Sequence, residues 1–277
     1  MKRASLNSRF GKEPFNMHTL TLKGMAALVA YCQQPPQTGA GKSSNRAGDN
    51  SFFGTPSLSA ALTLATNGWQ DGAAKAAKAL AARRPAAGAK TATRRSVTRY
   101  DVSGDDCDVA RYCSGDPENM TENRRVMIRG KTVRRVNVAL NFSSGVSGQT
   151  IMEYAVAVCA AVQRIEAGGN RVELWVKKQI GATSNGPAVF AMEIRVKEAG
   201  SRMQPAALAF ACGHPSFYRR LLFALVERFP ARDVTRISAD DYGFTKDDAS
   251  GGYLTSGTRW KHDEAVRAAI AELNAAN

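Results

Sequence analysis

The chain has 277 residues, of which 44% are hydrophobic and 22% are charged, and its formal net charge at pH 7 is +14. This hydrophobic fraction is ordinary for a globular protein, so collagen-like, coiled-coil and wholly disordered chains are excluded. No hydrophobic run approaches the ~18 residues that a membrane-spanning helix needs. We therefore expect a folded protein without a membrane partner.

The cysteines indicate a reducing compartment. The chain has five of them, spread over its length without a CxxC pair. A secreted domain held by disulfides is shorter and richer in cysteine, and a structural zinc site needs closely spaced ligands. We therefore expect free, mostly buried thiols in a cytoplasmic protein.

Positive charge is concentrated in the first third of the chain. Residues 1–100 contain 15 Lys and Arg against three acids, whereas residues 101–119 contain six acids and one Arg. Such an uneven distribution indicates an appendage that is distinct from a more balanced core. We therefore expect a basic N-terminal region with linkers and short helices at 1–119, and an α/β domain at 120–277.

Local patterns predict the elements of the basic region. Residues 24–32 are hydrophobic and predict a short buried helix or a strand, and residues 33–50 are rich in Gly, Pro, Ser and Asn and predict a linker. Residues 58–67 and 73–84 each predict a helix from helical spacing or strong helix formers. Residues 86–100 have little hydrophobic content and predict a mobile basic connector.

The pattern changes at residue 133. Residues 133–140 form a short β-branched run that predicts a buried strand, followed by a turn at 141–148. Residues 151–167 are hydrophobic nearly all round and predict a buried helix. Residues 171–180 and 188–199 alternate hydrophobic with polar side chains, which predicts two strands.

The remaining residues continue the alternation of strands and helices. Residues 205–229 predict a helical region that is interrupted at His214-Pro215, and residues 234–239 predict a further strand. A long loop at 240–257 precedes a terminal helix at 261–277. This order predicts an α/β fold with a mainly parallel sheet and helices on both faces.

Motifs for catalysis are weak. Residues 38–44 (TGAGKSS) are similar to a phosphate-binding loop, but Pro36 stands where the first glycine is needed. The three histidines are far apart, and no G-x-S-x-G or H-E-x-x-H motif is present. The acids Asp105, Asp106 and Asp108 are typical of solvated turns. We therefore lean against an enzyme, and an NTPase or a hydrolase using these acids ranks last.

A basic segment favours nucleic-acid binding. Eight Lys and Arg lie between residues 75 and 99, and a cluster of that size is sufficient to neutralise phosphates of DNA or RNA. These residues are Lys75, Lys78, Arg83, Arg84, Lys90, Arg94, Arg95 and Arg99. No zinc-finger or RNP motif accompanies them, so the alternatives are a solvated basic surface and pairing with the acidic 101–119 segment.

Four longer segments carry a family resemblance. They are FFGTPSLSAALTLATNGWQDG, DVSGDDCDVARYCSGDPENM, RIEAGGNRVELWV and HPSFYRRLLFALVERFP. Over roughly residues 50–275 the chain resembles an uncharacterised protein family of bacteriophages and actinobacterial genomes. The resemblance implies a viral or mobile-element origin, and hence the host cytoplasm, but no activity.

The order of elements after Val133 also resembles a von Willebrand factor A domain. Such domains carry a D-x-S-x-S motif after the first strand, and its oxygens hold a magnesium ion that captures an acidic group of a partner. Ser143 matches this motif, whereas Asn141 replaces the Asp and Gly145 replaces the second Ser. A hard divalent cation prefers carboxylate oxygen, so magnesium has only weak support and we expect no cofactor. Capping of the next helix by Ser143 or Ser147 is the plainer interpretation.

Loops at the carboxyl ends of parallel strands are where α/β sheets bind ligands. The residues expected at a partner-binding loop are Asn141, Ser143, Ser144 and Ser147. The leading hypothesis is a non-catalytic phage-type interaction protein that binds a protein partner, or a second copy of itself, through this loop. Nucleic-acid binding through the basic segment is the alternative.

Overall fold

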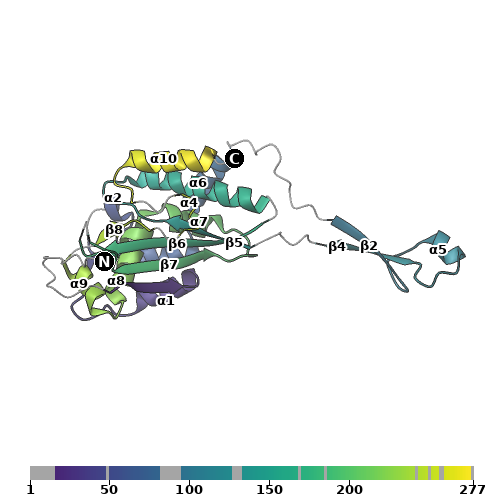
Figure 1. Cartoon of the computed structure of the whole chain (residues 1–277), viewed down its shortest axis with the longest axis horizontal. Coiled ribbons are helices and arrows are strands. Elements are labelled where there is room, and N and C mark those ends of the chain that lie inside the picture. Colours follow the sequence, from purple (N-terminus) through teal and green to yellow (C-terminus); the bar gives the residue numbers. More distant parts are fainter. Residues whose placement is uncertain are drawn as a thin grey trace, which may run out of the picture.

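A computed structural model of the chain describes residues 16–47, 50–81, 95–126, 133–167, 170–183, 186–240, 243–248, 251–255 and 259–275. These residues form one large sheet with helices packed against it and a second, smaller sheet (Figure 1). The mixed α/β architecture that the sequence predicts is therefore confirmed.

The large sheet is mostly parallel. Its strands, in spatial order, are β1 (His18–Leu22), β7 (Phe190–Lys197), β6 (Arg171–Gly181) and β5 (Val133–Ala139). A fifth strand, β8 (Phe244–Lys246), pairs with the carboxyl-terminal end of β6. β1 is parallel to β7 and β5 to β6, and parallel bridges join Asn137 to Tyr253 and Phe142 to Trp260. β6 is antiparallel to β7 and β8. A short loop joins β6 to β7, and such a loop permits only the antiparallel arrangement.

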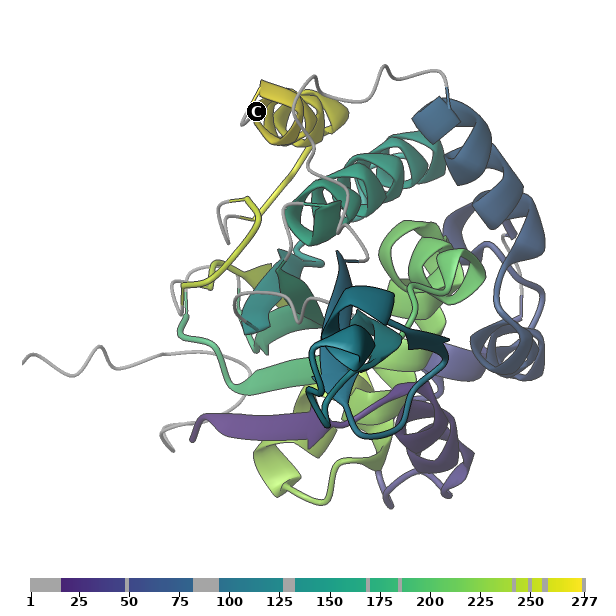
Figure 2. The same ribbon diagram turned by 90° about the vertical axis from the view of Figure 1, so that its right-hand side faces the viewer.

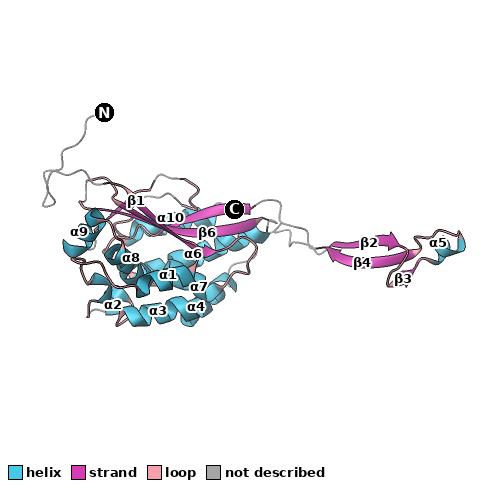
Figure 3. Cartoon of the chain, turned by 90° about the horizontal axis from the view of Figure 1, so that it is seen from below, coloured by secondary structure: helices cyan, strands magenta, loops and turns pink. Residues whose placement is uncertain are grey.

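The helices of the body pack on one face of this sheet. They are α1 (Met25–Gln33), α2 (Asn50–Phe53), α3 (Leu58–Asn67), α4 (Gln70–Ala81), α6 (Gly148–Ala167), α7 (Pro205–Gly213), α8 (Leu222–Arg228), α9 (Arg232–Asp240) and α10 (Asp263–Ala275), with a 3-10 turn η1 (Ser43–Asn45) and a π-helical turn η2 (Phe217–Leu221). Figures 2 and 3 show α1, α6, α7 and α8 on one side of the strands, with α3 and α4 farther from the sheet on the same side. No helix of the described residues covers the opposite face, so the expectation of helices on both faces was wrong.

Charged side chains explain why the second face lacks helices. Arg135 of β5 and Lys177 of β6 both pair with Glu193 of β7, at 3.0 and 2.8 Å. Arg195 pairs with Glu173 on the same face, at 3.4 Å. Ion pairs of this kind are stable on a sheet face that borders water. A helix that packs on a sheet needs a hydrophobic sheet face instead.

The N-terminal residues belong to the same body as the C-terminal ones. β1, which the sequence did not predict, pairs with β7, and Leu28 of α1 and Ala61 of α3 lie in the common hydrophobic core. The expected division between residues 119 and 120 therefore does not coincide with the structure, where Met120 begins a strand. Net charge describes solvation and association rather than fold, so a charge boundary is a poor guide to a domain boundary.

Buried polar side chains hold the predicted linker at 33–50 onto the body. Arg220 donates hydrogen bonds to the carbonyl oxygens of Thr55, from Nε (3.0 Å) and Nη2 (2.6 Å), and of Ser44, from Nη1 (2.9 Å). Glu227 of α8 accepts hydrogen bonds from the Ser44 backbone N–H (2.7 Å) and from its hydroxyl. This loop is thus a packed part of the structure and not a spacer between domains.

The second sheet forms a separate arm. It contains β2 (Arg95–Asp101), β4 (Met120–Val126) and β3 (Asp106–Cys107), in that order, with a short helix α5 (Val109–Cys113). Figure 1 shows the arm beyond the end of the large sheet. The mobile connector expected at 86–100 was wrong for residues 95–100, which form β2, and its residues 86–94 lie outside the described residues.

Most predicted helices are confirmed, and one predicted strand was wrong. Residues 24–32 form α1, residues 58–67 form α3, and the helical region at 205–229 is interrupted at His214 as expected. Residues 234–239 lie in α9 and not in a strand. Val234 and Ile237 are both buried, and their three-residue spacing places them on one side of a helix.

The cysteines are all free, and Cys32, Cys159 and Cys212 are buried as expected. Cys107 and Cys113 are exposed on the arm. In the described part of the chain, no helix combines the length and the hydrophobicity that crossing a bilayer requires.

Candidate anion-binding pocket

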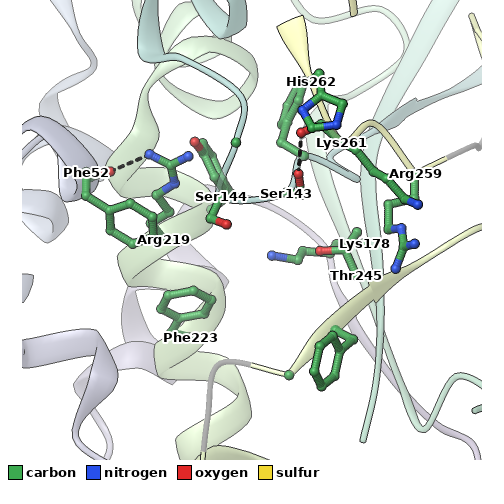
Figure 4. A pocket seen from close by; sticks show the side chains of 15 residues that line it. Phe52, Ser143, Ser144, Lys178, Arg219, Phe223, Thr245, Arg259, Lys261 and His262 are labelled. Carbon is green, nitrogen blue, oxygen red and sulfur yellow. Dashed lines mark hydrogen bonds between the residues drawn. The ribbon is translucent and has the colours of Figure 1, made fainter. Parts of the chain in front are cut away.

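A pocket of about 550 Å³ opens beside the 141–147 loop, at the carboxyl end of β5. Its walls come from this loop, β6, β8, η2, α8, α2 and the segment before α10 (Figure 4). The side chains that matter for its chemistry are Phe52, Ser143, Ser144, Lys178, Tyr218, Arg219, Phe223, Phe244, Thr245, Arg259, Lys261 and His262. The pocket therefore borders the loop for which the sequence predicts partner binding, and that binding stays a prediction.

The loop is held in place by hydrogen bonds to the segment before α10. Ser143 donates from its backbone N–H to the Trp260 carbonyl (2.9 Å) and from its hydroxyl to the Lys261 carbonyl (2.8 Å). Gly145 lies against the same chain segment, where an added Cβ would come within 2.7 Å of the Lys261 carbonyl oxygen. A side chain at residue 145 would therefore push the loop away from the segment that carries Lys261 and His262.

The four predicted loop residues divide into two pairs. Ser143 and Ser144 line the pocket. Asn141 is fully buried beneath the loop, and Ser147 caps α6 by accepting a hydrogen bond from the Thr150 N–H (3.2 Å). Ser147 also donates its hydroxyl to Asp263 (2.8 Å). The helix-capping interpretation is thus right for Ser147, and a direct role toward a ligand is open only to Ser143 and Ser144.

Lys178 is the least expected residue of the pocket. It follows Lys177 on β6 and points to the opposite face, toward the helices, where its side chain is 4% exposed. Its ammonium nitrogen lies 5.4 Å from the ring centre of Phe223 and 5.8 Å from that of Tyr218. Within the described residues this nitrogen has no hydrogen bond or ion pair. Burial, reinforced by the positive charge of Arg219, lowers the pKa of Lys178 to about 7.

Arg219 supplies a second buried cation. It lies in the π-helical turn η2, a local geometry that is frequent at functional sites. Its guanidinium donates hydrogen bonds to the carbonyl oxygens of Phe52 (2.8 Å) and Val146 (3.1 Å) and stacks on the Phe52 ring at 4.0 Å. These contacts fix the position of the guanidinium at the wall of the pocket.

The rim of the pocket is basic and aromatic. Arg259, Lys261 and His262 line it on one side (Figure 4). Phe244, 39% exposed, is also among the lining residues. No Asp or Glu is among the described residues that line the pocket. The buried hydroxyl of Tyr218 has no hydrogen-bond partner among the described residues, and burial raises its pKa, so it stays protonated. The pocket therefore offers hydrogen-bond donors and positive charge to an anion.

The pocket residues do not fit the magnesium ion that a von Willebrand factor A domain would hold. A magnesium site requires oxygen ligands with negative charge, and Lys178 and Arg219 occupy the pocket instead. Asp263, the first residue of α10, accepts hydrogen bonds from the backbone N–H and the hydroxyl of Ser147. Among the described residues no group of three or more His, Cys, Asp or Glu could hold a metal.

The predicted basic segment lies elsewhere. Lys75 and Lys78 are exposed on α4, Arg95 and Arg99 lie on β2 of the arm, and none of them lines the pocket. The other four predicted residues, Arg83, Arg84, Lys90 and Arg94, lie outside the described residues. Asp105, Asp106 and Asp108 belong to the arm, where Asp108 caps α5, and they do not approach the pocket.

Sequence reasoning missed Lys178 and Arg219, although each left a signal. In the alternating strand at 171–180, adjacent lysines at 177 and 178 cannot face the same side, so one of them must face the helices. Arg219 and Arg220 interrupt the hydrophobic run SFYRRLLFALV, which places two cations inside a buried helical region. Such residues need a structural partner or a ligand.

The fold and the pocket together define a mixed α/β protein with a pocket lined by Lys and Arg side chains at the end of a sheet strand. Residues 11–275 match a family described as Domain of unknown function (DUF7192), and the chain therefore belongs to this family. No curated protein matches the chain, and no solved structure matches it.

Proposed function

We propose that the protein binds single-stranded nucleic acid and holds one nucleotide in the pocket beside the 141–147 loop. The observation that carries this proposal is the pair of buried cations, Lys178 and Arg219, in a pocket that no described acid lines. Positive groups that line a pocket attract an anionic ligand, and such a ligand stabilises an ammonium ion that is buried away from water.

The other lining residues favour a nucleotide over a simple inorganic anion. Phe52, Phe223 and Phe244 place aromatic rings beside the cations, and a base has two flat faces that stack on such rings. The volume of about 550 Å³ lies in the range of small-molecule sites. Proteins that bind single strands without sequence preference combine these two features, a positive groove and aromatic platforms.

The proposal joins two of the hypotheses drawn from the sequence. It keeps the loop at the end of β5 as the place of recognition, and it takes nucleic acid as the partner. Capture of a protein partner by the same loop, a von Willebrand factor A relationship and a phage origin stay predictions. The net charge of +14 supports a polyanionic partner.

The test is fluorescence anisotropy of a labelled single strand of about 12 nucleotides, with a duplex of the same sequence as comparison. We expect tighter binding of the single strand, and an affinity that falls about twentyfold between ~50 and ~200 mM salt if three phosphates are neutralised. The double variant Arg259→Ala and Lys261→Ala should weaken binding and reduce the salt dependence.

The matched control changes two exposed lysines that lie away from the pocket. The double variant Lys75→Ala and Lys78→Ala removes the same charge from α4 and should leave binding near the wild-type level. Equal loss in both double variants would mean that net charge alone attracts the strand and would contradict the pocket proposal. Displacement of the strand by poly-glutamate at equal charge would favour an acidic protein partner instead.

A further inference from the structure

The two adjacent lysines of β6 have opposite electrostatic environments. Lys177 forms an ion pair with Glu193 at 2.8 Å on the helix-free face of the sheet. Lys178 faces the helices and is 4% exposed, and its ammonium nitrogen lies near the rings of Phe223 and Tyr218, with no hydrogen bond or ion pair among the described residues. An ammonium ion in such surroundings is unfavourable, whereas a neutral amine is not.

A neutral amine with access to a ligand pocket is a nucleophile. We propose that Lys178 forms an imine with the carbonyl group of a phosphate-bearing aldehyde that is held in the pocket. The proposal rests on the proposed function, because Arg219, Arg259 and Lys261, which would hold the phosphate of a nucleotide, would also hold the phosphate of the aldehyde, while the neutral form of Lys178 reacts with its carbonyl group. Lysines of this kind are activated by burial in a hydrophobic pocket or by a neighbouring cation, and Lys178 has both.

The step balances without an oxidant or a reductant. The lone pair of Nζ attacks the carbonyl carbon, and the π electrons of the C=O bond move to oxygen, which accepts a proton to give a carbinolamine. The carbinolamine then loses its hydroxyl group and the second nitrogen-bound proton as water, and a C=N bond forms. The Tyr218 hydroxyl, buried and without a hydrogen-bond partner among the described residues, is available to donate to the departing oxygen.

Two sources supply a phosphate-bearing aldehyde. One is a free phosphorylated aldehyde, and the other is the ring-opened sugar of an abasic nucleotide in a nucleic-acid strand. Both present an aldehyde close to phosphate, which is the chemistry that Lys178 and its neighbouring cations recognise. The experiment therefore contains one probe of each kind.

The first probe is pyridoxal 5′-phosphate, incubated with the full chain at neutral pH and reduced with sodium borohydride to trap the imine. Peptide mapping by mass spectrometry should place the main adduct on Lys178, with about tenfold less on any surface lysine. Pyridoxal, which lacks the phosphate, should label Lys178 less. The second probe is a single strand with one abasic site, which should give a borohydride-dependent covalent complex.

The adjacent lysine provides the matched variant. Lys177→Met should retain the adduct, and Lys178→Met should lose it. Circular dichroism checks that both variants fold, and the peptide map of the wild-type chain decides the question if Lys178→Met does not. Trapping of pyridoxal phosphate alone assigns the site to free aldehydes, and trapping of the abasic strand assigns it to nucleic acid.

Labelling spread evenly over surface lysines would overturn the imine proposal. If the labelled single strand still binds in that case, the proposed function stands and only the covalent step falls. Absence of both binding and trapping would overturn the two together.

Discussion

Arg219 and Lys178 are neighbouring buried cations, one on the π-helical turn and the other on β6, and the positive charge of Arg219 adds to the effect of burial in lowering the pKa of Lys178 to about 7. Two positive groups that repel one another in a buried site form an arrangement that a bound anion stabilises. Several consequences of this pair can be measured.

Binding of a single strand should weaken as the pH rises through 7. A bound phosphodiester raises the pKa of Lys178, so binding takes up a proton wherever the free lysine is neutral and the bound one is charged. Affinity should fall about tenfold between pH 6 and pH 8 in anisotropy titrations. An oligonucleotide is the correct probe, because its phosphodiesters do not titrate in this range.

The variant Lys178→Met tests whether this pH dependence belongs to Lys178 or to another group that lines the pocket. The variant should bind weakly at both pH values, with little change between them. A full tenfold fall in the variant would assign the pH dependence to another group and contradict our interpretation of Lys178.

Lys178→Met should also stabilise the unliganded protein. The substitution replaces a buried amine that lacks a described partner with a hydrophobic side chain of similar length, a gain of about 1 kcal/mol. For a chain of this size that corresponds to a melting temperature roughly 2–4 °C higher. Lys177→Met removes the ion pair with Glu193 and should lower the melting temperature instead. Differential scanning fluorimetry distinguishes the two, and a loss of stability in both would show that Lys178 has a structural role.

Arg220→Lys should destabilise the protein by about 2–4 kcal/mol, although the charge is kept. The guanidinium donates to the carbonyl oxygens of Thr55 and Ser44 at once, and an ammonium group cannot reproduce that fork. Urea unfolding measures the loss, and hydrogen exchange should rise first in the segment that contains residues 43–57. Arg232→Lys, an exposed position on α9, is the control and should change neither. An unchanged unfolding midpoint in Arg220→Lys would mean that the segment is held by other contacts.

The buried His214 should make the protein acid-sensitive. Burial lowers its pKa to about 4, while the unfolded state has an ordinary histidine. The unfolded state therefore binds more protons between pH ~6.5 and ~4, and stability falls across that window by about 3 kcal/mol and is constant above it with respect to this group. His214→Asn keeps an acceptor for the Ser216 N–H but does not titrate, so its stability should fall less. Parallel losses in both proteins at pH 4.5 and 7.5 would assign the sensitivity to carboxyl groups.

Elements with strong local signals were predicted correctly. α3 begins after Ser57, whose hydroxyl accepts a hydrogen bond from the Ala60 N–H, and ends before Gly68, which has a φ of 77°. Both signals are visible in the sequence because a cap and a left-handed glycine act on neighbouring residues. The strands β5, β6 and β7 were likewise readable from hydrophobic and alternating runs.

Elements that depend on distant partners were not predicted correctly. β2 pairs Arg95 with Val126 across the whole acidic segment, and β1 pairs with β7, which lies more than 150 residues later. Neither pairing can be recognised from the amino-acid composition of the strand itself. The polar, basic sequence of β2 has the composition of a connector, and only its pairing with β4 makes it a strand.

The sequence pointed to the loop that borders the pocket but not to the cations that line it. The 141–147 loop follows a parallel strand, so a rule of sheet topology places a ligand there. The cations come from three further segments, β6, η2 and the residues before α10, which only the fold brings together. Sequence alone could not show that Lys178 and Arg219 share a pocket with Ser143.

The most direct test of the central claim is to locate the bound strand on the protein. A single strand that carries 5-iodouridine, cross-linked by light and mapped by mass spectrometry, should attach to the pocket peptides that contain Phe52 or Phe244. Cross-links confined to the arm, at Tyr100 or Tyr112, or to the basic segment at 75–99, would contradict the pocket as the nucleic-acid site.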